Sequence, residues 1–426
     1  MKKYKKLLII SHNCLSKTGS NGRTLANYLQ GWPKDKIAQF YIHSENPDFD
    51  ICEQYYCMTD SSIARSILKR TPAGYKVEKD TIQNSNLNKA NISVKAKSKN
   101  SIVFSLREMA WKSKLWNRHD FYEWLESVAP EVILVQAGDA GFLLDLAVAV
   151  GKSFGASIIV YNTEGYYFKN NSYFSENWLS QFFYSGLNRR FKKSYEKLIR
   201  ASKGEIYNCD LLKNDYEKIF HTTSSVIMNT SEFTEEEVFY PKKRQIIYAG
   251  NLGLFRHKSL IEFANALKKV QSDMVIDVYG KVPNEEVKKE IEHCDGIKMH
   301  GFIPYEELKQ KLRESKYLLH VESFEPFYRE DLKYAFSTKI ADSLAAGSCL
   351  FVYAPENMAI SQYLNGKNAA ELITEQSNLE MQIRNVLINS EISKTYAKNG
   401  RELALKNHNI SINKNIFQML LIDKGE

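Results

Sequence analysis

Short apolar runs alternate with longer amphipathic stretches along most of the chain. The runs at 5–11, 132–136 and 157–161 each end in polar or turn-forming residues. Apolar runs of this length, bounded by turn signals, are typical of buried parallel strands, and the amphipathic stretches between them are typical of helices. Because helices commonly link parallel strands as crossover connections, the pattern predicts an α/β protein built from such units.

The clearest of these units lies between residues 317 and 355. The pattern there predicts a strand at 317–321, a loop rich in acidic and aromatic residues, a helix at about 337–346 and a second strand at 349–354. Gly347 follows the predicted helix, in a place where glycine commonly ends helices. We therefore expect a buried strand–helix–strand crossover in this part of the chain.

The start of this predicted helix has the chemistry of an anion-binding site. Ser337 or Thr338 can cap the helix, where unpaired backbone N–H groups and the helix dipole attract negative charge. Lys339 and Asp342 lie three residues apart and therefore share one helix face. We expect a phosphate at the helix start, with one cation and one carboxylate directed into the same cleft.

The string STKIADSLAAG, followed by CLFVYAP, resembles the nucleotide-sugar segment of bacterial GT-B glycosyltransferases, the group that includes glycosyltransferase family 4. In that group a carboxylate five residues before the glycine of an A-x-G turn binds the donor ribose, and Asp342 has this spacing to Gly347. A second family acid, eight residues earlier, is replaced by Tyr334. The resemblance implies that a nearby acid takes its place, and the candidates are Glu322, Glu325, Glu330 and Asp331.

A second phosphate-binding candidate follows the predicted strand that ends near residue 249. The loop begins at Gly250, and Arg256 and Lys258 lie at the start of the next predicted helix, an arrangement suited to anions. The resemblance implies contacts to the donor diphosphate, made in the family by an arginine and a lysine one and six residues after the glycine. Asn251 and Arg256 occupy those positions here, so we expect Lys258 or Lys339 to replace the missing cation. A surface ion pair is the alternative role for Arg256.

The phrase HGFIPYEEL resembles the segment of the same group in which a strand end contacts the nucleotide base. The resemblance implies that Gly301 and Phe302 lie near the base. A place in the hydrophobic core is the alternative for Phe302.

Gly19 and Gly22 lie in the loop between the first predicted strand and the first predicted helix. Glycine in such a turn lets the backbone approach a ligand closely. The spacing is not G-x-G-x-x-G, so a dinucleotide fingerprint is not supported. The resemblance implies a position near the acceptor and the donor diphosphate, and an ordinary surface turn is the alternative.

Polar residues follow two neighbouring strands of the first half. Asp139 comes after 132–136, and Asn162, Thr163 and Glu164 come after 157–161. Ligands of open α/β sheets bind beyond the carboxyl ends of the strands, which makes these residues acceptor-side candidates. Family members often carry His or Asp where Asp139 falls, so the resemblance implies that Asp139 lies near the reacting carbon. A turn carboxylate is the alternative role for Asp139.

Two histidines, His12 and His320, lie at predicted strand ends. An isolated histidine in such a place is more often structural than catalytic, and the sequence assigns neither of them an acidic partner.

The chain has 426 residues, which predicts two domains. We expect an acceptor-side domain at 1–235, a nucleotide-sugar domain at 242–400 and a final helix at 401–426 that packs back on the first domain. The longest apolar stretches fall far short of the ~20 residues of a membrane span. The six cysteines show no paired spacing, which favours reduced thiols in the cytoplasm, and no metal-binding pattern is present.

The net charge of +8 is concentrated between residues 65 and 119, where 13 Lys and Arg face 3 Asp and Glu, so that the remainder carries −2. This insertion has a polar low-complexity run and leads into a basic segment whose aromatic residues include Trp111, Trp116, Phe121, Tyr122 and Trp124. Contact with an anionic membrane surface is one interpretation. The other is a solvated loop followed by a helix whose aromatic residues pack on their own domain. Nucleic-acid binding is not favoured, because no recognised motif accompanies the charge.

Taken with the resemblance, these patterns predict an α/β fold of GT-B architecture, with two facing Rossmann-like domains and an interdomain cleft. The implied function is transfer of a sugar from a nucleotide-diphosphate donor to a hydroxyl group of a glycan or polyprenyl-linked acceptor. The family further implies retention of anomeric configuration, no metal or cofactor, and a role in capsule, exopolysaccharide or lipopolysaccharide assembly at the inner face of the membrane. Two alternatives remain open: a non-catalytic carbohydrate-binding or scaffold subunit, and a nucleotide-sugar epimerase.

Overall fold

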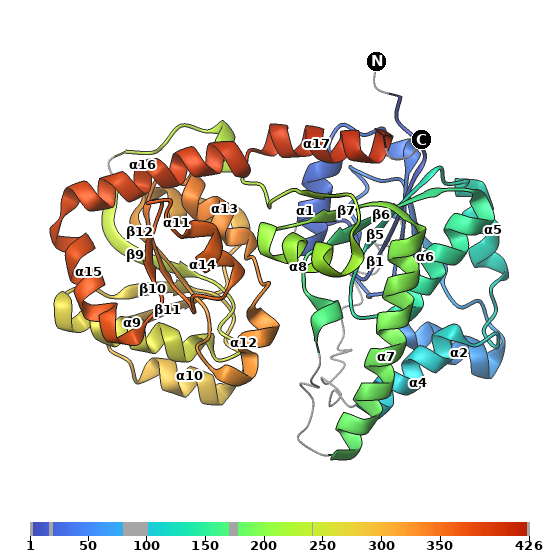
Figure 1. Ribbon diagram of the computed structural model, residues 1–426, viewed down its shortest axis with the longest axis horizontal. Helices are drawn as coiled ribbons and strands as arrows, with labels where there is room; N and C mark the ends of the chain where they lie inside the picture. Colours follow the sequence, from blue (N-terminus) through green and yellow to red (C-terminus); the bar gives the residue numbers. More distant parts are fainter. Residues whose placement is uncertain (1–2, 17–19, 80–100, 170–177, 241, 424–426) are drawn as a thin grey trace. The chain divides into compact units, whose positions relative to one another are not determined.

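The computed structural model describes residues 3–16, 20–79, 101–169, 178–240 and 242–423 (Figure 1). The chain forms two compact units. Unit 1 comprises Met1–Tyr207, Asp215–Ser225 and Lys414–Glu426, and unit 2 comprises Asn208–Asn214 and Val226–Asn413. Of the predicted first domain at 1–235, residues 208–214 and 226–235 therefore lie in unit 2, as do residues 401–413 of the predicted final helix.

Unit 1 contains an eight-stranded sheet in the order β4-β3-β2-β1-β5-β6-β7-β8. Strands β1, β2 and β5 are buried along their whole length, as expected for continuous apolar runs in a parallel sheet. Leu7 of β1 pairs in parallel with Ile37 of β2 on one side and Val132 of β5 on the other, whereas β4 pairs antiparallel with β3. The strands are β1 (Leu7–Ser11), β2 (Ile37–Tyr41), β3 (Gln54–Cys57), β4 (Tyr75–Val77), β5 (Val132–Gln136), β6 (Ser157–Asn162), β7 (Ser202–Tyr207) and β8 (Ser224–Val226).

The strand order of unit 1 reverses between β1 and β5. From β1 the chain continues outward to β2 and β3, and from β5 it continues in the opposite direction to β6 and β7. Such a switch point opens a crevice beyond the carboxyl ends of the two strands. The helices of this unit are α1 (Ser20–Leu29), α2 (Asp60–Lys69), α4 (Ser101–Lys112), α5 (His119–Val128), α6 (Gly141–Phe154), α7 (Trp178–Ala201) and part of α8 (Asp210–Phe220), with η1 (Lys34–Lys36) and η3 (Tyr166–Phe168) as 3-10 turns.

Unit 2 contains a six-stranded sheet in the order β11-β10-β9-β12-β13-β14, in which every neighbouring pair is parallel. Its order reverses between β9 and β12, which places a second switch point there. Figure 1 shows helices on both faces of this sheet, with α9, α10 and α15 on one of them. The strands are β9 (Lys243–Ala249), β10 (Ile276–Tyr279), β11 (Ile297–Gly301), β12 (Ser315–Val321), β13 (Cys349–Tyr353) and β14 (Glu371–Ile373).

The loop predicted after residue 321 contains a helix, α12 (Pro326–Leu332), whose first residue is a proline. Proline is favoured at the first position of a helix because its fixed φ suits the helix and its missing N–H is not needed there. The other helices of unit 2 are α9 (Arg256–Val270), α10 (Glu285–Glu292), α11 (Tyr305–Glu314), α13 (Thr338–Ala345), α14 (Ala359–Leu364), α15 (Leu379–Ile388) and α16 (Ser390–Asn407), with η4 (Glu232–Glu235) and η5 (Gln376–Asn378).

The last helix, α17 (Ile410–Asp423), belongs to unit 1 from Lys414 onward. Phe417 is fully buried and stacks on Tyr28 of α1, with ring centroids 4.7 Å apart. The side chain of Gln418 donates hydrogen bonds to the backbone oxygens of Tyr28 and Gln30. The chain thus returns to its first unit after α16 has completed the second.

The aromatic residues of the basic insertion are mostly core residues. Trp111, Trp116, Phe121 and Trp124 are all no more than 6% exposed, and Tyr56 packs against both Phe121 and Trp124. The interpretation of these rings as a membrane-facing surface is therefore wrong for these four, whereas Tyr122, the fifth ring of the segment, is 41% exposed. The low-complexity run at 80–100 lies outside the described residues. None of the helices that the structure describes is long and apolar enough to cross a membrane.

Candidate active site

The switch point of unit 1 holds a histidine and an aspartate in contact. His12 follows β1 and Asp139 follows β5, and His12 Nε2 lies 3.3 Å from Asp139 Oδ1. A Cβ atom on Gly138 would lie 2.1 Å from Cε1 of His12, so the glycine allows the loop after β5 to approach the imidazole. The topology therefore gives His12 the acidic partner that the sequence did not assign.

Asp139 is ionised at neutral pH. Desolvation by itself would raise the pKa of Asp139, but the hydrogen bond with His12 and the charges of His12, Arg107 and Lys169 outweigh it and lower the pKa to about 2. The carboxylate side chain is more than half exposed. A permanently charged acceptor is thus available to a ligand at the end of the sheet.

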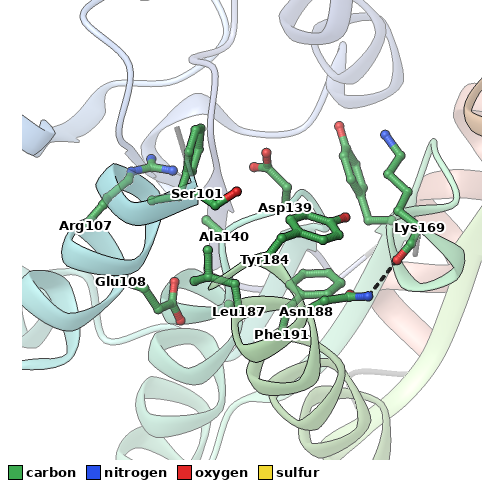
Figure 2. Close-up of a pocket in the computed structure, with 13 residues that line it drawn as sticks. Ser101, Arg107, Glu108, Asp139, Ala140, Lys169, Tyr184, Leu187, Asn188 and Phe191 are labelled. Carbon is green, nitrogen blue, oxygen red and sulfur yellow. Dashed lines mark hydrogen bonds between the residues drawn. The ribbon is translucent and has the colours of Figure 1, made fainter. Parts of the chain in front are cut away.

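A pocket of about 110 Å³ opens beside Asp139 (Figure 2). Figure 2 shows Asp139 between Arg107 of α4 and Lys169, which follows η3. Arg107 Nε lies 2.8 Å from Asp60 Oδ1, and Asn188 of α7 donates a hydrogen bond to the backbone oxygen of Lys169. The lining residues are Ser101, Phe104, Arg107, Glu108, Asp139, Ala140, Gly141, Tyr166, Lys169, Tyr184, Leu187, Asn188 and Phe191.

The other acceptor-side candidates differ in their access to a ligand. Glu164 is about half exposed and lies 3.7 Å from Lys169 Nζ. Because Lys169 lines the pocket beside Asp139, Glu164 can contact a ligand that binds there. Asn162 is 1% exposed, and its Oδ1 accepts a hydrogen bond from the Tyr195 hydroxyl. Because Asn162 is buried, we expect it to support the structure rather than to contact a ligand. The neighbouring Thr163 is partly exposed.

Of the two glycines predicted to lie in the first loop, the structure describes Gly22. A Cβ on Gly22 would lie 2.2 Å from the backbone oxygen of Cys14, so this glycine permits close packing of α1 on the loop before it. Gly22 is buried, and a packing role accounts for it without a ligand. Gly19 lies outside the described residues.

The switch point of unit 2 holds a charged pair. Arg256 begins α9, Glu322 follows β12, and Arg256 Nε lies 2.7 Å from Glu322 Oε2. His320 Nε2 lies 3.2 Å from the other carboxylate oxygen. Glu322 is 1% exposed. Its desolvation would raise the pKa, but the charge of Arg256 and the hydrogen bond and charge of His320 lower the pKa below its usual range.

The loop that precedes Arg256 has a constrained backbone. Leu254 and Phe255 adopt φ values of 56° and 61°, in the left-handed region that side chains other than glycine seldom occupy. Asn251 Oδ1 accepts a hydrogen bond from the Gly253 N–H, and the Gly250 N–H bonds to the Tyr279 oxygen of β10. Strained backbone of this kind clusters at ligand sites, where surrounding structure maintains it.

The predicted cations of the second unit do not all gather at Glu322. Lys258 Nζ lies 2.7 Å from Glu290 Oε2 of α10, and His257 contacts the same oxygen at 3.2 Å. Arg256 is thus joined to Glu322, whereas Lys258 is held by another acid. Glu325 is exposed and precedes α12.

The predicted cap of α13 is present, since the Lys339 N–H donates to Ser337 Oγ. Asp342 on this helix is 3% exposed, and its two oxygens accept hydrogen bonds from the hydroxyls of Ser231 and Tyr305. Each carboxylate oxygen can accept more than one hydrogen bond, and the ribose role of Asp342 stays a prediction. Thr338 and Lys339 are partly exposed at the same helix start.

Tyr334, which replaces the family glutamate, is buried, and its hydroxyl accepts a hydrogen bond from Lys333. Among the candidate acids, Glu322 is joined directly to Arg256.

Gly301 and Phe302 end β11 and begin the following loop. Gly301 has a φ of 74°, which favours glycine, and Phe302 is 70% exposed with Lys281 Nζ 5.0 Å from its ring centre. The alternative of a core position for Phe302 is therefore wrong. The exposed ring is accessible to a ligand, and its contact with a nucleotide base stays a prediction.

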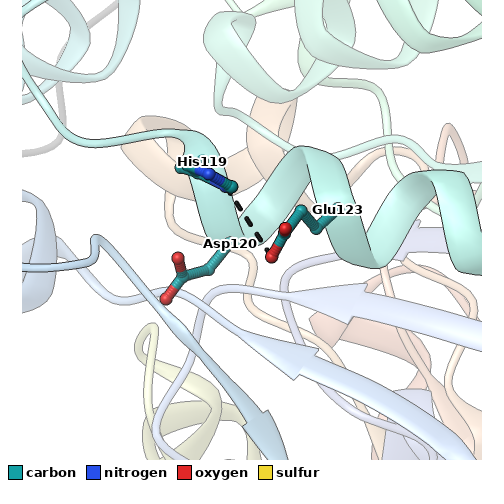
Figure 3. A group of neighbouring side chains, drawn as sticks. All are labelled: His119, Asp120 and Glu123. Atoms are coloured by element: carbon teal, nitrogen blue, oxygen red, sulfur yellow. Dashed lines mark ion pairs between the residues drawn. The ribbon is translucent and has the colours of Figure 1, made fainter.

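Among the described residues, His119, Asp120 and Glu123 bring possible metal-ligand atoms within 4.8 Å of one another (Figure 3). All three side chains are exposed, and His119 and Glu123 lie one helical turn apart as an ion pair. They belong to the start of α5 and line neither switch point. An exposed acidic group of this kind is common on helices and carries no argument for a metal site.

Comparison with known proteins connects this geometry to a family. Residues 256–413 match the family described as glycosyl transferase-like, a segment that begins at Arg256 and includes Glu322. No curated protein matches the chain.

Solved structures resemble the chain over nearly its whole length. HepE of Anabaena in complex with UDP has a TM-score of 0.64 at 11% identity, covering 97% of this chain and 99% of its own. Sucrose-phosphate synthase of Thermosynechococcus elongatus has a TM-score of 0.62 at 11% identity, with 98% of both chains covered. A TarM mutant of S. aureus, in complex with fondaparinux, alpha-GlcNAc-glycerol and UDP, has a TM-score of 0.61 at 11% identity, covering 98% and 100%. The chain therefore has the GT-B fold, as the sequence resemblance implied.

Proposed function

We propose that this GT-B protein is a glycosyltransferase that moves a sugar from a nucleoside-diphosphate donor to a hydroxyl group of a glycan or lipid-linked acceptor. The observation that carries the proposal is the buried Arg256–Glu322 pair at the switch point of unit 2, inside the segment that matches the glycosyl transferase-like family. Two of the structural relatives were solved with UDP. On that basis a uridine diphosphate sugar is the donor that we propose.

Unit 2 supplies the donor-side groups in this proposal. Negative charge grows on the departing diphosphate during glycosyl transfer, and fixed cations and backbone dipoles stabilise it best where water is excluded. Arg256, Lys339 and the N-terminus of α13 at Ser337 are the groups of this kind near the strand ends. Glu322 holds Arg256 in position and can bind a sugar hydroxyl once a phosphate shares the guanidinium.

Unit 1 supplies the acceptor-side groups. The Asp139 carboxylate accepts a hydrogen bond from the acceptor hydroxyl and aligns its oxygen for attack on the anomeric carbon. His12 holds the carboxylate, and Glu164 contacts a second hydroxyl of the acceptor. The pocket beside Asp139 receives the part of the acceptor next to the reacting hydroxyl.

The proposal includes the finer features that the family 4 resemblance implies. These are retention of the anomeric configuration, transfer without a metal ion, and a place in capsule, exopolysaccharide or lipopolysaccharide assembly. The anomeric proton coupling of the product distinguishes retention from inversion, and transfer in the presence of EDTA tests the independence from metal ions.

Contact with the inner face of a membrane is a further part of the proposal. Helix α4 exposes apolar side chains and packs between α2 and α7, which carry exposed basic residues. Apolar groups surrounded by cations suit a surface of anionic lipids. The exposed apolar residues are Ile102, Val103, Leu106 and Met109 of α4 and Phe182 and Phe183 of α7. The exposed cations of the two flanking helices include Arg65 and Lys69 of α2 and Arg189 and Arg190 of α7.

A second candidate is a non-catalytic carbohydrate-binding subunit with the same fold. The buried Tyr334 in place of the family glutamate, and Asn251 in place of the family arginine, favour it. This candidate differs in one measurable respect, because it binds ligands without releasing a nucleoside diphosphate.

The test of the donor site is thermal stabilisation by a panel of nucleoside diphosphates and nucleotide sugars. A ligand that binds the native state raises the melting temperature according to its concentration and affinity. We expect UDP and its sugars to raise it in the wild type and not in Arg256→Ala. Lys268→Ala, a change of a partly exposed side chain at the other end of α9, serves as the matched control. Equal shifts in wild type and Arg256→Ala, or no shift with any nucleotide in folded protein, would refute the donor site.

A further inference from the structure

Strand β12 ends near a histidine that the proposed mechanism does not use. His320 is the next-to-last residue of the strand, and its Nε2 lies 3.2 Å from Glu322 Oε1. Arg256 Nε lies 2.7 Å from the other oxygen of the same carboxylate. Glu322 therefore lies between two nitrogen groups, one from its own strand and one from the start of α9.

The carboxylate between them is closed off from water. The side chain of Glu322 is 2% exposed, whereas those of Arg256 and His320 are 14% and 13% exposed. A buried carboxylate is stable as an ion while nearby positive groups compensate its charge, and removing that compensation is costly. A new charge beside Arg256 therefore changes the electrostatic energy of Glu322 as well.

A diphosphate bound to Arg256 brings such a charge. A guanidinium has five N–H donors, so Arg256 can bind a phosphate while its Nε keeps the hydrogen bond to Glu322. The positive charge of Arg256 is then shared between two anions. Because charges away from water are screened weakly, the energy of the Glu322 carboxylate rises unless a further positive charge forms beside it.

His320 can supply that further charge. Imidazole is the side chain whose charge changes most readily near neutral pH. Since Nε2 lies beside Glu322, the incoming proton binds Nδ1, and among the residues that the structure describes none forms a hydrogen bond with this second nitrogen. The imidazole is partly exposed, so water can deliver the proton.

The other ionisable groups beside β12 have partners of their own. The strand packs against β9, β13, α9 and α11, and the acids in the first turn of α11, Glu306 and Glu307, are exposed. Desolvation raises the pKa of Glu322, and Arg256 and His320 outweigh it. The remaining pairs are Tyr248 with the Asn251 oxygen, Tyr353 with Glu262, Tyr305 with Asp342, and His257 and Lys258 with Glu290.

We infer that His320 takes up a proton from water when a diphosphate binds Arg256, and that the resulting imidazolium keeps Glu322 ionised and aligned with the guanidinium. His320 is a positioning residue, because it acts on the ligand through Glu322 and Arg256. Coupling between two binding events is reciprocal, so a proton on His320 also raises the affinity for the diphosphate. The inference rests on the proposed function, since the diphosphate is that of the donor.

The test is calorimetric titration of UDP into the full chain at neutral pH, in Tris and in HEPES buffer. A proton taken from the buffer adds the ionisation enthalpy of that buffer to the measured heat, so the two heats give the number of protons taken up. Changes in the ionisation of UDP itself are common to all variants, and differences between variants therefore report on the protein.

We expect the wild type to take up as much as about one proton more per UDP than His320→Gln does. The glutamine amide still donates a hydrogen bond to Glu322 but cannot carry a charge. His293→Gln, a change of an exposed side chain that follows α10, should keep the wild-type value.

The pH dependence of affinity gives a second readout. From about pH 8.5 to about pH 6.5, the UDP affinity of the wild type relative to His320→Gln should rise about fivefold or more, since couplings between sites are typically about 5–150-fold. A merely structural role of His320 would lower the affinity equally at both pH values. If His320→Gln shows no cooperative melting transition, Glu322→Gln takes its place, because it removes the charge that the proton compensates and should abolish the extra uptake.

Failure of this inference differs from failure of the donor site. UDP binding with the same proton uptake in the wild type and in His320→Gln, or with an affinity ratio that does not change with pH, would overturn the role of His320 and leave the donor site intact. Absence of UDP binding to the folded wild type would overturn the donor site and this inference with it.

Discussion

A pair of ionisable side chains follows the central strands of each sheet, His12 with Asp139 in unit 1 and Arg256 with Glu322 in unit 2. Removing charges from water costs several kcal/mol per ion, so the Arg256–Glu322 pair, which is largely buried, is weak evidence of a stabilising role. Asp139 of the other pair is more than half exposed, and such pairs contribute little to stability. Both pairs lie at switch points, where open sheets bind ligands. Function accounts for their position better than stability does.

Unfolding experiments can show whether the Arg256–Glu322 pair stabilises the fold. Arg256→Ala leaves a carboxylate that is 1% exposed without its cation, and we expect a loss of about 3–5 kcal/mol in unfolding free energy. Replacing both residues, with Arg256→Met and Glu322→Leu, should recover most of the lost unfolding free energy. Urea denaturation of the two variants and the wild type checks this. A double variant as unstable as the single one would mean that the pair itself supports the fold.

Asp139 should contribute to the pH dependence of stability. Its pKa is lowered from 3.8 to about 2 in the folded chain, so its contribution is present above the unfolded pKa and lost as the pH falls toward about 2. Asp139→Asn should therefore reduce stability at pH 5 and have little effect near pH 2. Denaturant midpoints of both proteins at the two pH values measure this difference. A midpoint difference that does not change with pH would contradict the interaction with His12.

At the scale of elements, α4 combines a buried face with an exposed apolar one. Trp111 stacks on Phe142 of α6 at 4.3 Å, while Leu106 and Met109 are 60% and 58% exposed. These faces could not be distinguished from the residue pattern, because both are apolar and a basic segment surrounds them. The proposed membrane contact therefore shifts from Trp111 to the exposed side of the same helix.

Leu106→Asp combined with Met109→Asp should weaken binding to vesicles that contain phosphatidylglycerol. Full burial of each of these side chains contributes about 1.5–3 kcal/mol, so a reduction of at least about tenfold is expected. Vesicle sedimentation measures the bound fraction, and Met381→Asp, an equally exposed change on α15 of unit 2, is the control. Unchanged binding in the double variant would exclude this face of α4.

At the scale of the whole molecule, the sequence predicts the central strands of both sheets well, because continuous apolar runs as short as 132–136 and 349–353, bounded by turn residues, are typical of buried strands. It also places Asp139 and Arg256 in the segments that follow strands. Pairing them with His12 and Glu322 needs the strand order, which brings distant segments of the chain together. The hydroxyl partners of Asp342 could not be predicted for the same reason, since Ser231 lies far from Asp342 in the sequence. Tertiary contacts of this kind leave no local pattern.

The central claim is that unit 2 binds a nucleoside diphosphate through Arg256. Calorimetric titration of UDP into the full chain tests it most directly. We expect one molecule of UDP to bind per chain, with affinity reduced at least about tenfold in Arg256→Ala, or about 1.4 kcal/mol, and unchanged in Lys268→Ala. Absence of binding to the folded wild type, or the same affinity in Arg256→Ala, would contradict the account.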